Sequence, residues 1–290
     1  MKYKNICGLY FSATGNTKKV VQAMAQTACE RSKGTSEKKD ECASNVDFMV
    51  APEFFDVTLP EGREKEYIFK KEDLVIIGAP TYAGKLPNKI MPFFRGNLKG
   101  NGAKCIAVVT YGNRSFDNAA AELTSILTTN GFDVLAVAAI VSEHSFSEKL
   151  AAGRPNEKDL NEICAWVSEV LANKNKDNLC HSIIPGDAEA GYYVPKQING
   201  QPAVFLKAKP ETDVAKCIRC GKCVDSCPMG SIDKADPVNI SGICIKCQAC
   251  IKVCPARAKF FSDEQFLSHV EMLELNFAQE KQNFYLVLSE

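Results

Sequence analysis

The residues best suited to chemistry in this 290-residue chain are its cysteines. The chain has fourteen, and eight of them form two runs with the spacing C-x2-C-x2-C-x3-C-P. The first run is Cys217, Cys220, Cys223 and Cys227, and the second is Cys244, Cys247, Cys250 and Cys254. A structural zinc site takes four ligands from paired C-x2-C units and has no use for a third cysteine at this spacing. Disulfides need an oxidising compartment. The runs therefore predict iron–sulfur clusters.

The doubled run resembles that of bacterial two-cluster ferredoxins, in which the fourth cysteine of each run binds the other cluster. The resemblance implies two 4Fe–4S clusters with crossed ligands. One cluster would take Cys217, Cys220, Cys223 and Cys254, and the other would take Cys244, Cys247, Cys250 and Cys227. The six other cysteines are scattered singly, as is typical of small buried apolar side chains.

A second motif follows the first apolar run of the chain, residues 6–11. It consists of Ser12, Ala13, Thr14, Gly15, Asn16 and Thr17, and a helical pattern follows over 18–30. A glycine-containing turn before a helix presents backbone N–H groups to an anion. The turn lacks the G-K-[ST] ending of an ATP or GTP loop and the G-x-G-x-x-G of an NAD turn. It resembles the flavodoxin phosphate loop [ST]-x-T-G-N-T, which implies FMN. A simple helix N-cap is the alternative.

Two further loops follow predicted strands and are expected to contact the flavin ring. Each offers an aromatic ring, a small residue and polar groups. The first loop is Pro80, Thr81, Tyr82, Ala83 and Gly84, and the second is Thr110, Tyr111, Gly112, Asn113 and Arg114. Arg114 either stabilises charge on the reduced flavin or forms a surface ion pair. His144 is expected to be capped or exposed to solvent rather than to relay protons.

The predicted elements around these loops alternate between strand and helix. Apolar strand patterns occupy 6–11, 46–50, 74–78, 106–109 and 134–141, and helical patterns occupy 18–30, 116–127 and 160–171. Continuous β-branched runs are typical of strands buried on both faces of a parallel sheet. The pattern predicts an α/β fold, a flavodoxin-like doubly wound sheet of five parallel strands in the order 2-1-3-4-5.

The chain is expected to contain a second, smaller unit. Residues 1–173 form the predicted FMN-binding domain, and 174–212 form a connector rich in proline and glycine. Residues 213–261 form a small α+β domain that holds both clusters, and 262–290 form a C-terminal helical tail. This order of motifs resembles the fused flavodoxin–ferredoxin proteins (the ferrodoxin family) of anaerobic bacteria. The resemblance implies electron transfer between FMN and the clusters.

Two alternatives remain at this stage, a flavin-dependent reductase of a small acceptor and a redox sensor, so whether the chain is an enzyme is left open. Lys plus Arg and Asp plus Glu both number 35, which provides no basic surface for nucleic acid. The longest apolar run is too short to span a membrane. We expect a cytoplasmic protein whose partner is a ferredoxin-like donor or an acceptor enzyme, attracted by Lys222, Lys246 and Lys252. Direct reduction by NADH is not expected.

Overall fold

The structure, a computed structural model, describes residues 3–34, 51–172 and 183–288. Five parallel strands form the centre of its main sheet, in the order β2-β1-β4-β6-β7. They are β1 (Asn5–Tyr10), β2 (Glu53–Asp56), β4 (Asp73–Pro80), β6 (Lys104–Tyr111) and β7 (Asp133–Val141). Counted along the chain this is the order 2-1-3-4-5, so the predicted flavodoxin-like sheet is confirmed. The strand expected at 46–50 lies outside the described residues.

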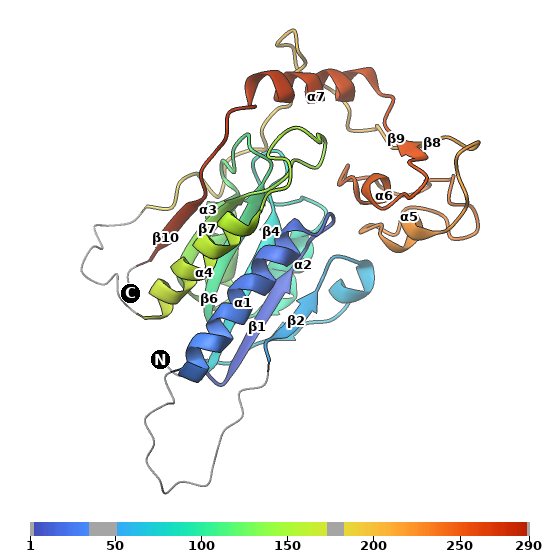
Figure 1. Ribbon diagram of the computed structural model, residues 1–290. Helices are drawn as coiled ribbons and strands as arrows, with labels where there is room; N and C mark the ends of the chain where they lie inside the picture. Colours follow the sequence, from blue (N-terminus) through green and yellow to red (C-terminus); the bar gives the residue numbers. More distant parts are fainter. Residues whose placement is uncertain (1–2, 35–50, 173–182, 289–290) are drawn as a thin grey trace, which may run out of the picture.

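Helices cover both faces of the sheet (Figure 1). Helices α1 (Asn16–Gly34) and α4 (Glu157–Leu171) pack on one face, while α2 (Met91–Gly96) and α3 (Ala119–Thr129) pack on the other. The strands between them are buried on both sides, which explains their uninterrupted apolar sequences. Helix α4 begins three residues earlier than expected, because Asn156 and Asp159 form a reciprocal capping box at its start.

The remaining elements are short, apart from one helix. They are η1 (Pro60–Arg63), the paired strands β3 (Tyr67–Ile68) and β5 (Leu98–Lys99), the paired strands β8 (Glu211–Thr212) and β9 (Lys259–Phe260), and α5 (Lys222–Asp225), α6 (Ala249–Lys252), α7 (Glu264–Asn276) and β10 (Phe284–Val287). Helices α5 and α6 each lie within one cysteine run and contain its third cysteine, Cys223 and Cys250. No helix within the three described ranges is both long and apolar enough to cross a membrane.

The C-terminal segment differs from the expected helical tail. After α7 the chain returns to the main sheet and adds β10 antiparallel to β7 (Figure 1). The main sheet therefore has six strands rather than five. Tyr285 stacks at a tilt against Trp166, with ring centroids 4.9 Å apart. The side-chain oxygen of Asn283 accepts a hydrogen bond from the Val141 N–H at 3.0 Å. A four-residue edge strand has too little pattern to be recognised without its partner.

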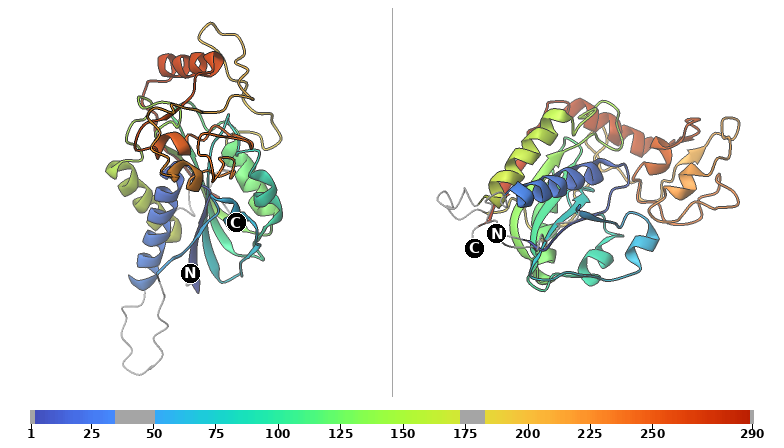
Figure 2. Two further views of the ribbon diagram at one scale, coloured as in Figure 1. Left: turned by 90° about the vertical axis from the view of Figure 1, so that its right-hand side faces the viewer. Right: turned by 60° about the horizontal axis from the view of Figure 1, so that its bottom comes forward.

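The cysteine-containing part, which we call the cluster module (residues 209–261), lies beside the sheet domain, with α7 across one end (Figures 1 and 2). Among the described residues, a hydrogen bond and an ion pair help to join the module to the sheet domain. The Arg63 guanidinium donates to the Pro228 carbonyl at 2.6 Å, and Lys252 forms an ion pair with Glu143. The connector is held as well, because Lys85 donates to the Ala188 and Ala190 carbonyls at 2.8 and 2.6 Å.

Candidate cofactor sites

The predicted phosphate loop joins β1 to α1. Gly15 has φ +90°, a conformation that favours glycine, and a Cβ atom there would meet nothing within 4 Å. The glycine is therefore required by the backbone rather than by crowding. Ser12 accepts a hydrogen bond from the Lys18 N–H at 3.0 Å, so its hydroxyl also caps the helix. Thr17 and Thr110 share a hydrogen bond of 2.7 Å, which ties α1 to β6.

Two adjoining cavities lie beyond this loop. The smaller, about 40 Å³, is lined by the phosphate loop and by residues that follow β4, β6 and β7. The larger, about 180 Å³, continues from it, and the two share Thr81, Tyr82 and Ser145. The buried Thr81 hydroxyl has no hydrogen-bond partner within the described residues. A small polar end joined to a larger, aromatic end, with an unsatisfied hydroxyl between them, fits the phosphate and ring of FMN.

The residues predicted to contact FMN divide between these cavities. The smaller is lined by Ser12, Ala13, Thr14, Asn16, Thr17, Pro80, Thr81, Tyr82, Thr110, Tyr111 and Gly112, and the larger by Thr81, Tyr82, Ala83 and Arg114. Gly15, Gly84 and Asn113 line neither cavity. A Cβ on Gly84 would lie 2.4 Å from the Asp117 carboxylate, so this glycine allows close packing of the loop.

Asn113 binds the C-terminal segment instead, and Tyr111 binds that segment in addition to lining the smaller cavity. The buried Asn113 amide donates to the carbonyls of Phe277 and Gln279 at 2.6 and 2.9 Å. The Tyr111 hydroxyl donates to the Gln282 carbonyl at 3.1 Å, and its ring packs edge-on against Phe116. Of the two tyrosines expected to stack on the flavin, Tyr82 alone lines both cavities without holding this segment.

Two histidines in the larger cavity were not expected there. Burial lowers the pKa of His144 to about 4, with His269, Lys252 and Arg114 adding to the effect. Its Nδ1 accepts a hydrogen bond from the Phe146 N–H at 3.0 Å, so the ring is capped as predicted. The ring also lines the larger cavity, which was not predicted. His269 Nδ1 lies 2.8 Å from the Lys196 carbonyl oxygen, and burial lowers its pKa too.

The larger cavity is enclosed by segments far apart in the sequence. Besides the loops after β4, β6 and β7, it is lined by Tyr193 and Phe205 of the connector, Ile245 and Lys246 of the second cysteine run, and His269 of α7. The described residues that line it include Arg114 and Lys246 but no Asp or Glu. Arg114 lies over the Tyr193 ring, 3.9 Å from its centroid, and pairs with Asp117. Arg114 thus forms an ion pair, as one of the two expectations held, but it does so while lining the cavity.

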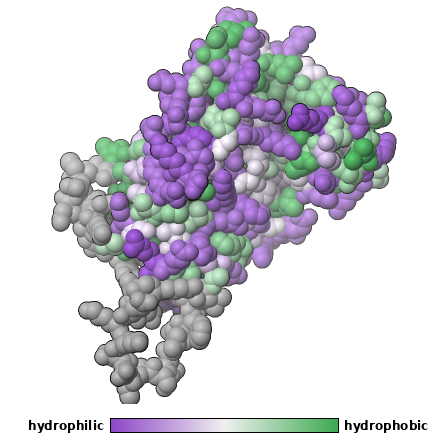
Figure 3. Space-filling model, in the orientation of Figure 1, coloured by the Kyte–Doolittle hydropathy of each residue, from purple (hydrophilic) through white to green (hydrophobic). Residues whose placement is uncertain are grey.

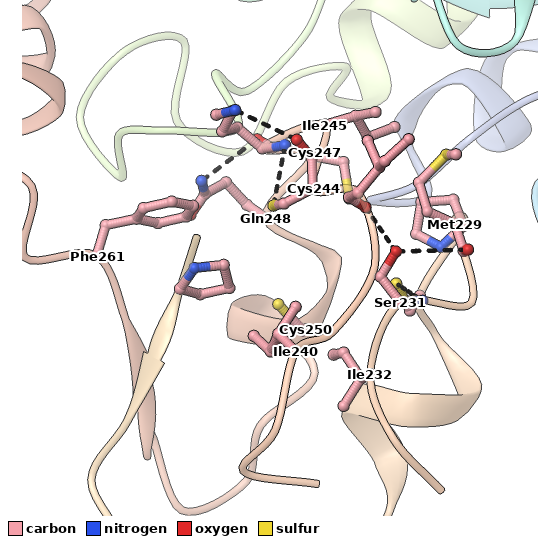
Figure 4. A pocket seen from close by; sticks show the side chains of 15 residues that line it. Met229, Ser231, Ile232, Ile240, Cys244, Ile245, Cys247, Gln248, Cys250 and Phe261 are labelled. Carbon is pink, nitrogen blue, oxygen red and sulfur yellow. Dashed lines mark hydrogen bonds between the residues drawn. The ribbon is translucent and has the colours of Figure 1, made fainter. Parts of the chain in front are cut away.

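The eight cysteines of the two runs gather around two further cavities. One is lined by Cys244, Cys247, Cys250 and Cys227 (Figure 4), and the other by Cys217, Cys220, Cys223 and Cys254. Each cavity thus combines three cysteines of one run with the fourth of the other, the same grouping that the ferredoxin resemblance implies. All eight are free thiols. Burial raises the pKa of Cys247 and of Cys250 to about 12, so binding iron must displace their protons.

The two runs also repeat each other in backbone conformation. Positive φ angles occur at three pairs of matching positions: Arg219 and Lys246, Gly221 and Gln248, and Gly230 and Arg257. The fourth cysteine of each run accepts a backbone N–H: Ser231 donates to Cys227 at 3.4 Å and Ala258 to Cys254 at 3.3 Å. Such bonds to sulfur tune the potential of an iron–sulfur cluster.

Residues 209–255 match the family of the 4Fe-4S dicluster domain. This part of the chain is similar to 4Fe–4S dicluster domains. The prediction of two clusters is confirmed, and the zinc and disulfide alternatives were wrong. Among the described residues, no three His, Cys, Asp or Glu side chains converge closely enough to hold a single metal ion. No curated protein sequence matches the chain.

Solved flavodoxins are similar to the N-terminal part. A flavodoxin from the domain Archaea is 19% identical and covers 58% of this chain and 97% of its own, with a TM-score of 0.37. Oxidised flavodoxin 2 from Bacillus cereus is 17% identical and covers 59% of this chain and 99% of its own, with a TM-score of 0.38. The rubredoxin oxygen:oxidoreductase of Desulfovibrio gigas is 14% identical and covers 62% of this chain and 38% of its own, with a TM-score of 0.39. The sheet order itself identifies the domain as flavodoxin-like.

Two of the three lysines expected to attract a partner have other roles. Lys246 Nζ donates to the Leu206 carbonyl and lines the larger cavity, and burial lowers its pKa. Lys252 forms the ion pair with Glu143. Within the described residues, Lys222 is the one of the three that stays exposed without an ion pair.

Proposed function

We propose that this chain is an iron–sulfur flavoprotein that transfers electrons between two 4Fe–4S clusters and one FMN. The observation that carries the proposal is the shared position of Ile245 and Lys246. These two residues lie between Cys244 and Cys247, and they also line the larger cavity beside Tyr82. The two kinds of site are therefore neighbours within one chain. When bound, FMN supplies the exchange between one-electron and two-electron chemistry, and the clusters supply one-electron steps.

The residues that would hold FMN follow from the two cavities. The backbone of residues 12–17, at the start of α1, binds the phosphate through N–H groups and the helix dipole. Thr81 offers its unpaired hydroxyl, and Tyr82 offers its ring. Arg114 and Lys246 supply positive charge near the ring.

The organisation of the chain is part of the proposal. The FMN-binding domain takes residues 1–173 together with β10, the connector takes 174–212, and the cluster domain takes 213–261. We place the protein in the cytoplasm of an anaerobic cell. Its partner is a soluble redox protein, either a ferredoxin-like donor or an acceptor enzyme. A flavin-dependent reductase is the second candidate, favoured by the two histidines that line the larger cavity.

Anaerobic purification followed by iron and flavin analysis tests the proposal. We expect about eight irons per chain, the content of two cubane clusters, together with one FMN. Reduced ferredoxin should then bleach the flavin absorbance, whereas excess NADH alone should not, because the turn at residues 12–17 is assigned to the FMN phosphate and lacks the G-x-G-x-x-G of an NAD turn. A protein with about four irons, with FAD in place of FMN, or with rapid stoichiometric bleaching by NADH would contradict the proposal.

A further inference from the structure

The two cysteine cavities differ in their relation to the sheet domain. We call the cavity of Cys244, Cys247, Cys250 and Cys227 the inner cavity, and that of Cys217, Cys220, Cys223 and Cys254 the outer cavity. Residues next to the inner cysteines touch the sheet domain at several points. Pro228, after Cys227, accepts the Arg63 hydrogen bond, and Met229 packs against the apolar core of the sheet. A Cβ on Gly230 would lie 3.6 Å from Pro60.

The loop from Cys244 to Cys247 is a wall between the inner cavity and the larger FMN cavity. Ile245 lines both cavities and packs against the core of the sheet domain. Lys246 lines both as well. Figure 4 shows Ile245 beside Cys244 and Cys247.

The outer cavity has no such neighbour. Every described residue that lines it lies between Cys217 and Lys259, within the cluster module. Cys220 is exposed, and the side chain of Ile218 beside it is 67% exposed. Apolar and polar residues are interspersed over the module, at the right of Figure 3. This side of the module is accessible to another protein.

We propose that the two clusters have fixed and different tasks: the cluster of the inner cavity exchanges electrons with the flavin across the Ile245–Lys246 wall, and the cluster of the outer cavity exchanges them with a one-electron carrier protein. This inference rests on the proposed function and adds an order to it. Each carrier molecule is oxidised by one electron, which reduces the outer cluster and then the inner one. Each cluster returns to its oxidised state when it passes the electron on. Two carrier molecules therefore supply the two electrons of a fully reduced flavin, whose protons come from water.

Matched alanine variants test this order. Cys247 and Cys220 are both the second cysteine of their run, so Cys247→Ala and Cys220→Ala remove equivalent ligands of the inner and outer clusters. The first readout needs no carrier: the fluorescence lifetime of bound FMN, which a nearby cluster shortens by quenching. We expect Cys247→Ala to lengthen this lifetime and Cys220→Ala to leave it near the wild-type value. Cys247→Ser and Cys220→Ser, which keep an oxygen ligand for iron, serve if the alanine variants do not fold.

The second readout is anaerobic mixing with reduced ferredoxin, followed by EPR of the clusters and absorbance of the flavin. In Cys247→Ala the outer cluster should still be reduced while flavin bleaching is lost. In Cys220→Ala the fast reduction of both the inner cluster and the flavin should be lost, although light-driven reduction of the flavin persists. Equal lifetimes in the two variants, the opposite pattern, or wild-type bleaching in either variant would overturn the order. Failure of the wild-type clusters to reduce the flavin at all would instead refute the proposed function.

Discussion

The sheet domain and the cluster module are stabilised by different means. In the sheet domain, strands β4 and β6 are buried on both faces, between two large apolar cores. The cluster module has little comparable core: Phe205, Phe261 and Phe266 form a small group mainly with the connector and α7. Val214, Ile218 and Ile243 are more than half exposed. Hydrophobic burial is therefore sufficient for the first region, whereas the second needs its clusters to hold the cysteine loops together.

The largest expected effect separates these two regions directly. Removal of iron by an anaerobic chelator should abolish the structure of residues 213–261, because their strained loops lose the bonds that hold them. The main sheet should stay folded. Hydrogen exchange checks this, and we expect complete loss of amide protection in α5 and α6 with unchanged protection in β4 and β6. Parallel loss of protection in both regions would mean that the sheet domain depends on the module.

Removal of the fourth cysteine of either run should damage one half of the module. Cys254→Ala is expected to remove the cluster built on Cys217, Cys220 and Cys223, and Cys227→Ala the cluster built on Cys244, Cys247 and Cys250. Each variant should retain about four irons, the content of one cubane. EPR of the reduced proteins distinguishes the remaining cluster in each. The crossed assignment is wrong if each variant loses the cluster of its own run.

The same two regions differ in how far the sequence reveals them. Strands β1, β4, β6 and β7 are continuous apolar runs, so neighbouring residues reveal them. The cysteine grouping is what the resemblance of the two runs to bacterial two-cluster ferredoxins implies. The wall of the larger FMN cavity could not be predicted, because Tyr193, Lys246 and His269 come from three distant segments. Asn113 was assigned to the flavin because it follows a strand at the correct edge. Its partners, the carbonyls of Phe277 and Gln279, are backbone groups that no side-chain pattern reveals.

The hydrogen bonds between Asn113 and the C-terminal segment predict a moderate loss of stability when this side chain is removed. Asn113→Ala removes both hydrogen bonds that the buried Asn113 amide donates to the Phe277 and Gln279 carbonyls, and each contributes about 0.5–1.5 kcal/mol. Limited proteolysis should cleave the segment between α7 and β10 faster than in wild type, while the FMN dissociation constant changes little. Asn97→Ala is the matched control, because this half-buried asparagine donates an exposed hydrogen bond to the Lys65 carbonyl at 3.2 Å. A large loss of FMN affinity with an intact C-terminal segment would restore the flavin-binding role.

The smallest effect over the pH range tested concerns His144, which lines the larger cavity. Its pKa is about 4 in the folded protein and 6.5 when unperturbed, so the unfolded chain binds the additional proton between these values. Stability should be unaffected by this group above about pH 6.5 and should fall as the pH decreases toward 4, with a slope of at most about 1.4 kcal/mol per pH unit. Lys252, Arg114 and His269 oppose protonation, whereas Glu274 favours it.

Urea unfolding between pH 5.5 and 7.5 checks this prediction, because this interval covers the upper part of the range in which the unfolded chain takes up the His144 proton and the unaffected range above it. Trp166 is the single tryptophan and lies in α4, so its fluorescence follows the sheet domain. His144→Gln should flatten the dependence of the unfolding free energy on pH without abolishing it, because the pKa of His269 is also lowered by burial. His269→Gln is the matched variant, and the double variant should be the flattest. An unchanged slope in His144→Gln would mean that the imidazole takes up its proton in the folded state as readily as in the unfolded chain, and that the cavity is open to water at this wall.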